Sequence, residues 1–232
     1  MIASPLKRGA TYISMNRVFL LSPARCDGPR ARQALSPNAT FALAAALRSP
    51  DGASLGDLFT FISGLYFRGK LTYARRFAQP PDPLNPIVGP GVHVITPNAG
   101  LRTPDTTVTQ AAVRAFASGD IDADNAKYRR PLEASARALL REIGPECDVV
   151  LLGSIASPKY VDILGRIFGE RLRFPIAFVG RGDMSRGGLL LRHARDGAEL
   201  EYVPVAGASL HGARPPKLPP LRRRSADLSG NR

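Results

Sequence analysis

Short apolar runs that end in turn residues alternate with amphipathic or alanine-rich segments along most of this chain. The runs at 17–22, 91–96 and 148–153 predict three buried strands, each followed by a turn. Helices are expected between and after them, at 38–48, 55–78, 106–118, 131–143 and 158–171. Because strands and helices alternate through residue 180, the pattern predicts an α/β fold with a mixed, largely parallel sheet and flanking helices.

The pattern changes in the last third of the chain. Residues 173–179 and 188–194 are apolar enough to be strands on either side of a glycine-rich loop, 179–188. Asp196-Gly197 is a hairpin signal, and 199–205 is expected to be the returning strand. The sequence therefore predicts a C-terminal antiparallel hairpin at one edge of the sheet.

Composition divides the chain into three parts. Residues 1–15 are expected to form a flexible extension, with Met15 as an alternative natural start directly before the first strand. Residues 16–208 are expected to form a single α/β domain. Residues 209–232, rich in proline and arginine, are expected to be a disordered basic tail.

Several features argue against a membrane or metalloprotein. The start of the chain lacks a signal peptide's apolar core, and no apolar run approaches the ~20 residues that span a membrane, so we expect a cytoplasmic protein. Two cysteines and three scattered histidines have no metal-ligand spacing. The cysteines are expected to be reduced thiols, and we expect neither a metal nor another cofactor.

The net charge of +13 fits a polyanionic partner such as nucleic acid. More than half of it lies near the ends, with +3 in residues 1–17 and +5 in residues 211–232. The loop at 179–188 adds Arg181 and Arg186 among four glycines, a composition that suits an anion-binding loop. The alternative is an ordinary connection whose arginines are solvated.

Polar side chains follow each predicted strand. Because parallel strands place their carboxyl ends at one edge of a sheet, these side chains are expected to share a cleft with the glycine-rich loop. They are Ser22 and Arg25, then Asn98 and Asp105, then Ser154, Lys159 and Tyr160, and finally Arg181 and Arg186.

Each of these residues has a proposed role in the cleft. Arg25, Arg181 and Arg186 are expected to hold phosphate. Ser22, Asn98 and Tyr160 are expected to orient a base or sugar. Asp105, Lys159 and Tyr160 are the acid–base candidates if the cleft is catalytic. Each also has a structural alternative: Tyr160 as core, Lys159 as a solvated charge, and Asp105 as a turn or cap residue.

The order of these motifs resembles the YaaA family over about residues 16–192. That family has a Ser-Pro-Ala-Lys turn, matched here by Ser22-Pro23-Ala24-Arg25, and a Ser-Gly-Leu-Tyr-Gly segment with a Pro-Leu-Asp stretch, which 96–101 with Pro104-Asp105 resembles. The segment from Val149 to Tyr160 is similar to a family strand, small-residue turn and helical tyrosine. The most specific match is the segment 181–186, Arg-Gly-Asp-Met-Ser-Arg, against Arg-Gly-Leu-Met-Ser-Arg in the family.

A second resemblance is to a group of uncharacterised uracil-DNA-glycosylase-like proteins. Leu65-Tyr66, Tyr73-Ala74 and Gly100-Leu101 with Pro104-Asp105 resemble that group's order of motifs. The chain departs from the YaaA pattern in two places: Arg25 replaces a lysine, and no clear helix-hairpin-helix copy is present.

Together the resemblances imply a YaaA-like protein that binds nucleic acid or a nucleotide-type ligand in a basic cleft, with a role in DNA protection or the stress response. The alternative is an enzyme that acts on a nucleobase or nucleoside in the same cleft. A third interpretation is a protein without catalysis that coats DNA or binds a partner.

Overall fold

The computed structural model describes residues 16–156, 158–208, 212, 213, 215, 216 and 218. The predictions for residues 1–15 and for most of the tail at 209–232 concern residues outside this part.

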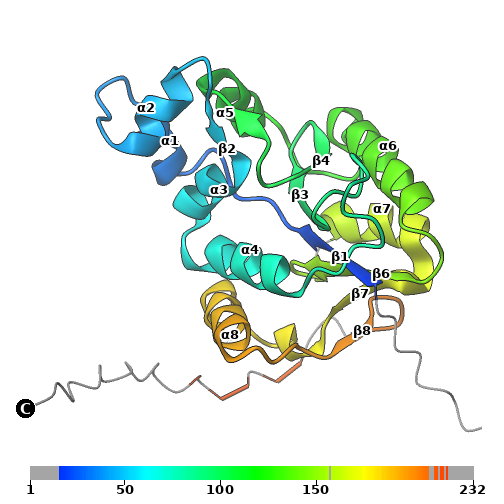
Figure 1. Ribbon diagram of the computed structural model, residues 1–232. Helices are drawn as coiled ribbons and strands as arrows, with labels where there is room; N and C mark the ends of the chain where they lie inside the picture. Colours follow the sequence, from blue (N-terminus) through cyan, green and yellow to red (C-terminus); the bar gives the residue numbers. More distant parts are fainter. Residues whose placement is uncertain (1–15, 157, 209–211, 214, 217, 219–232) are drawn as a thin grey trace, which may run out of the picture.

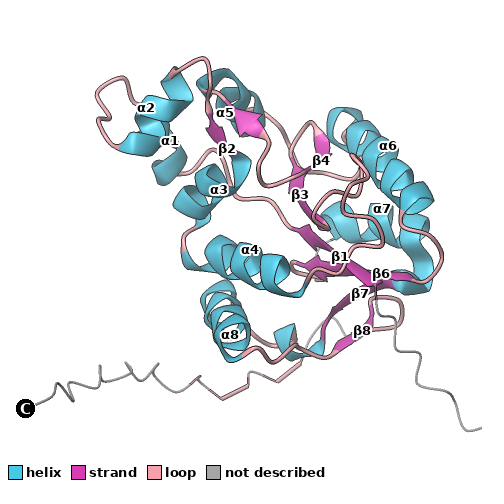
Figure 2. Cartoon of the chain, viewed as in Figure 1, coloured by secondary structure: helices cyan, strands magenta, loops and turns pink. Residues whose placement is uncertain are grey.

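The centre of the molecule is a mixed sheet of six strands in the order β4-β3-β1-β6-β7-β8, which confirms the predicted fold class (Figures 1 and 2). The inner strands β3, β1, β6 and β7 are parallel, and the two edge strands are antiparallel to their neighbours. The strands are β1 (Asn16–Leu21), β3 (Val92–Thr96), β4 (Gly100–Arg102), β6 (Cys147–Leu152), β7 (Leu172–Pro175) and β8 (Tyr202–Pro204). A small antiparallel pair, β2 (Ala53–Ser54) and β5 (Thr107–Val108), lies apart from this sheet.

Helices cover both faces of the sheet, which is why its two central strands carry uninterrupted apolar stretches, at 18–21 and 149–152. The helices are α1 (Pro29–Leu35), α2 (Ala42–Arg48), α3 (Leu55–Ser63), α4 (Leu65–Phe77), α5 (Gln110–Ala117), α6 (Ala126–Glu142), α7 (Pro158–Phe168) and α8 (Asp183–Asp196). Alternate residues of β1 enter two separate cores: Phe19 and Leu21 pack with α3, α4 and α8, whereas Val18 and Leu20 pack with α6 and α7. Figure 1 shows these two helical layers on opposite sides of the strands.

The C-terminal region corrects one sequence prediction. Residues 188–194 are not a strand, because they belong to α8, and the expected loop at 179–188 is partly the first turns of that helix. Asp196-Gly197 ends the helix instead of turning a hairpin, with Gly197 in the left-handed region at φ 69°. The predicted antiparallel C-terminal edge is present, because β8 pairs antiparallel with β7, but the connection between these two strands contains α8.

Smaller differences concern the helices. The expected helix at 55–78 is two helices, α3 and α4, separated at Gly64 with φ 60°, whereas Gly69 lies inside α4 without interrupting it. Pro131 lies inside α6, which begins at Ala126, rather than in its first turn. The helix α1 was missed, because the turn signals before it extend to Pro29.

The glycines of α4 and α8 allow these two helices to pack with their backbones in contact. A Cβ added to Gly69 would lie 2.6 Å from the carbonyl oxygen of Gly187, and one added to Gly187 would lie 2.8 Å from the carbonyl oxygen of Leu65. Backbone atoms cannot yield as a flexible side chain can. Gly187 is therefore required for helix packing, not for a mobile loop.

Gly187→Ala tests this close packing. We expect it to lower the free energy of unfolding by at least about 1 kcal/mol, because the steric cost of overpacking exceeds the gain in helix propensity. The matched control is Gly188→Ala in the same helix, where the nearest atom to an added Cβ is 3.7 Å away. Urea unfolding should show that control to be neutral or slightly stabilised, and equal effects of the two changes would contradict the packing argument.

Candidate functional site

A cavity of about 570 Å³ opens at the carboxyl ends of the parallel strands. Its wall includes the residues that follow β1, from Ser22 to Asp27, together with Pro97 after β3 and Ser154 after β6. The chain leaves β1 toward β3 on one side and later returns to β6 on the other, so β1 and β6 flank a point where the strand order reverses. Crevices at such points are where open α/β sheets bind ligands.

The structure brings together about half of the predicted site residues. Ser22, Arg25, Ser154, Lys159 and Tyr160 all line this strand-end cavity. The start of α8 borders it too, because Asp183 shares the wall with Pro23. The expected convergence of separate strand-end turns and the glycine-rich segment is therefore present in the fold.

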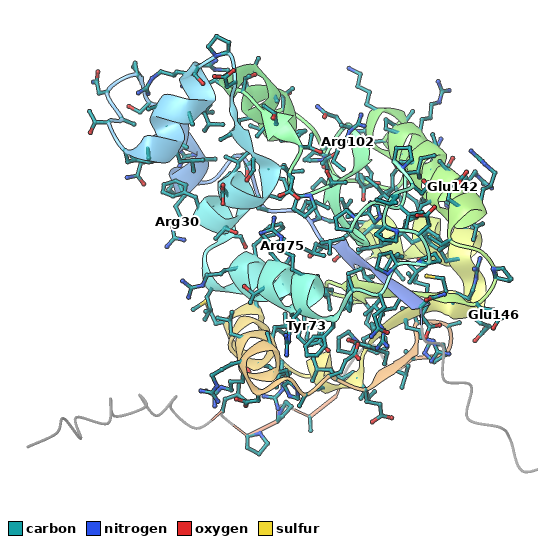
Figure 3. The ribbon with its side chains drawn as sticks, in the orientation of Figure 1. Arg30, Tyr73, Arg75, Arg102, Glu142 and Glu146 are labelled. Carbon is teal, nitrogen blue, oxygen red and sulfur yellow. The ribbon has the colours of Figure 1, made fainter. Side chains whose placement is uncertain are left out.

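The remaining predicted residues are not among the described residues that line the strand-end cavity, and other protein groups hold their side chains. The Asn98 amide donates to the Ala115 carbonyl oxygen at 3.0 Å. The Asp105 carboxylate pairs with Arg75, which Figure 3 labels on α4, at 2.7 Å.

The two arginines of the glycine-rich segment also bind the protein itself. Arg181 donates to the Ala177 carbonyl oxygen at 3.0 Å and lines a neighbouring cavity of about 760 Å³ beside α8. Arg186, with its side chain 13% exposed, donates to the Phe178 carbonyl oxygen and lies 3.6 Å from Asp183. Both guanidinium groups therefore help to fix the chain around α8, and neither is among the described residues that line the strand-end cavity.

The wall of the strand-end cavity is mixed in charge. It carries the cations Arg25 and Lys159 and three carboxylates, Asp27, Asp120 and Asp183. Arg25, whose side chain is 84% exposed, pairs with Asp27 at 2.7 Å and lowers the pKa of that carboxyl. The net positive charge of the chain is therefore not concentrated in this wall.

The most unusual group near the cavity is Lys70, which the sequence interpretation missed. Its side chain lies on α4, only 1% of the residue is exposed, and its amine donates to the Ser22 carbonyl oxygen at 2.7 Å and contacts the Ser22 hydroxyl oxygen at 2.8 Å. The amine also lies 4.5 Å from the ring centroid of Tyr66 and 4.9 Å from that of Phe67. None of the ion pairs found among the described residues involves Lys70.

Burial without a close carboxylate strongly favours the neutral amine. Desolvation lowers the pKa of Lys70 to about 7, and the positive charge of Arg186 acts in the same direction. The negative charge of Asp183 opposes this shift but does not overcome it. A lysine near its midpoint at neutral pH can hold or release a proton there.

A sequence signal for Lys70 did exist. Tyr66, Phe67, Tyr73 and Ala74 lie three or four positions away from Lys70 and are all buried, so Lys70 lies on the apolar face of its helix. A lysine in the middle of an apolar helical face is a buried polar group that requires a partner.

Tyr160 completes the polar floor of the cavity. Its hydroxyl donates to the Ser154 carbonyl oxygen at 3.0 Å and accepts from the Ser154 amide at 3.1 Å. Burial raises the pKa of this phenol. A Cβ added to Gly153 would lie 2.9 Å from both the Tyr160 hydroxyl oxygen and the Ser22 Cβ, so glycine lets these two side chains approach each other.

Comparisons of the chain with family models, with curated proteins and with solved structures find no match. Within the part of the chain that the structure describes, no helix combines the length and apolarity of a membrane span, and no three His, Cys, Asp or Glu side chains are grouped to hold a metal ion. The interpretation of the site therefore depends on its own geometry.

The lowered pKa of Lys70 predicts a pH-dependent stability. Because the folded pKa of about 7 lies below the ordinary value of 10.5, the unfolded chain binds more protons between these values, and stability rises with pH in that window. Relative to Lys70→Met, the wild-type free energy of unfolding should rise by about 1.4 kcal/mol per pH unit between roughly pH 7.5 and 9. Urea unfolding measures both proteins, and parallel pH profiles would show that Lys70 is not neutral in the fold.

Proposed function

We propose that this is a YaaA-like cytoplasmic protein that binds a nucleotide-type ligand in the strand-end cavity. The observation that carries the proposal is the position of the cavity: turns after β1, β3 and β6 share one wall where the strand order reverses.

The chemistry of the wall supports a ligand with a base and a sugar. Hydroxyls of Ser22 and Tyr160, exposed cations at Arg25 and Lys159, and a carboxylate at Asp183 provide donors and acceptors around an open space of about 570 Å³. Carboxylates suit sugar hydroxyls, and the two cations suit a single phosphate group better than a long polyphosphate.

A small ligand is favoured over a duplex as the occupant of this cavity. Duplex binding depends on many cations that neutralise backbone phosphates. The cavity wall holds three carboxylates, which would repel backbone phosphates. Arg181 and Arg186 donate to backbone carbonyl oxygens of the protein. The YaaA resemblance still supports a nucleic-acid-linked role in DNA protection or stress response, with nucleic acid as the competing occupant.

Calorimetric titration with a panel of nucleosides and mononucleotides tests the proposal. We expect at least one member to bind, and Lys159→Glu to weaken binding of a mononucleotide about tenfold or more through repulsion of its phosphate. The matched control is Arg166→Glu, which makes the same charge change farther along α7 and outside the cavity wall. No binding by any panel member, or equal affinity in the two variants, would count against the proposal.

The same variants separate nucleic acid from small ligands. Fluorescence anisotropy with single- and double-stranded oligonucleotides, repeated across salt concentrations, should show weak binding that Lys159→Glu leaves unchanged. Deletion of residues 211–232 should abolish that binding if the basic tail is responsible. Oligonucleotide binding that depends on Lys159 would instead favour nucleic acid as the occupant.

A second function, chemistry on a nucleobase or nucleoside, is favoured by one observation. Lys159 and Tyr160, two of the three acid–base candidates, line the cavity, whereas Asp105 is paired with Arg75 elsewhere. Release of a free base from nucleosides or DNA, detected by mass spectrometry, is the result that this function requires.

A further inference from the structure

We infer that Ser22 is a nucleophile and Lys70 its general base, so that the strand-end cavity is an acyl-transfer site that hydrolyses carboxylic esters or thioesters. This inference depends on the contact between the two side chains and holds whether or not the occupant of the cavity is a nucleotide.

The side chains of Ser22 and Lys70 are in direct contact. The amine of Lys70 lies 2.8 Å from the hydroxyl oxygen of Ser22, within the distance at which a proton passes between a nucleophile and its base. Ser22 is the first residue after β1 and borders the cavity. Serine–lysine pairs are an established variant of the arrangement in which a base activates a serine hydroxyl.

The two side chains differ in their access to the cavity. Lys70 is 1% exposed and is not among the described residues that line the cavity, whereas Ser22 does line it. The amine therefore cannot reach a substrate to form a covalent bond of its own. It can act only through the hydroxyl that separates it from the cavity.

Charged and titratable groups on neighbouring helices surround the amine. Asp183 and Arg186 act on it from α8 with opposite signs, Tyr66 lies beside it on α4, and the Tyr160 phenol from α7 lies close to Ser22. Burial lowers the pKa of Lys70 to about 7. Near neutral pH a large fraction of the amine is unprotonated and can accept the serine proton.

The reaction that these groups support proceeds in two balanced halves. The Ser22 oxygen attacks the carbonyl carbon and forms a C–O bond while its proton passes to Lys70. The bond to the leaving oxygen or sulfur then breaks, the leaving group takes a proton from solvent water, and an acyl-serine remains beside protonated Lys70. Water attacks the acyl carbon and gives up a proton to solvent, and the bond to Ser22 breaks as Lys70 returns the stored proton to the serine oxygen.

A purely structural role for Lys70 explains less. Satisfying the end of β1 requires only the bond from the amine to the Ser22 carbonyl oxygen, at 2.7 Å. The additional contact places the amine against the hydroxyl of a serine that borders the cavity. The two roles differ in what they predict for the reactivity of Ser22.

Labelling with a small alkyl fluorophosphonate, followed by peptide mapping, tests the inference on the full chain. We expect one adduct, on Ser22, whose rate of formation rises about tenfold per pH unit below pH 7 and levels off above about pH 8 as Lys70 loses its proton. Lys70→Met, which keeps the side-chain volume but cannot accept a proton, should slow labelling about 100-fold or more. Ser49→Ala, a change of a serine at the end of α2 and outside the cavity wall, should label as the wild type does.

Three results would overturn the inference: no adduct on Ser22 between pH 6 and 9, a rate that does not change with pH, or equal labelling of Lys70→Met. If Lys70→Met does not fold, the pH dependence of the labelling rate of the wild type tests the inference by itself. Adding nucleotides separates this inference from the proposed function. If Ser22 is labelled and no nucleotide slows the labelling, the result supports the serine–lysine pair and counts against nucleotide binding.

Discussion

The buried amine of Lys70 is the constraint on which the rest of the site depends. An amine in an apolar core is costly unless it is hydrogen-bonded, and here both oxygens of Ser22 satisfy it. The contact joins α4 to the carboxyl end of the central strand β1. It therefore fixes the position of Ser22 at the floor of the cavity and links the stability of the fold to the protonation of one lysine.

The packing of α8 against α4 sets the electrostatic surroundings of that amine. Gly69 and Gly187 let the helix backbones touch, which brings Asp183 and Arg186 close enough to act on Lys70. Arg186 is held by the Phe178 carbonyl oxygen, so its charge has a fixed place. Gly187 and Arg186 therefore influence the site indirectly, through helix packing and through the charge near Lys70.

The sequence predicted the sheet well because its inner strands are buried on both faces. Val18 to Leu21 and Val149 to Leu152 are apolar without interruption, and the turns after them converge because parallel strands end at one edge. The convergence of Ser22, Ser154 and Tyr160 follows from this topology alone. Their chemical partners could not be predicted in the same way, because partners depend on how helices pack.

Helix α8 shows where local pattern fails. Leu189 to Leu191 resemble a strand when taken with their glycine neighbours, but the close contact with α4 favours a helix. Arg181 and Arg186 then point to carbonyl oxygens that no linear motif reveals. Lys70 was missed because a lysine in a helix is usually solvated. Only its apolar neighbours at helical spacing indicate that it is buried.

The most direct test is an NMR titration of the Lys70 side-chain amine in the folded protein. We expect a midpoint near pH 7, well below the ordinary lysine value of 10.5. A Lys70 midpoint near that ordinary value would contradict the buried, neutral amine and with it the activation of Ser22.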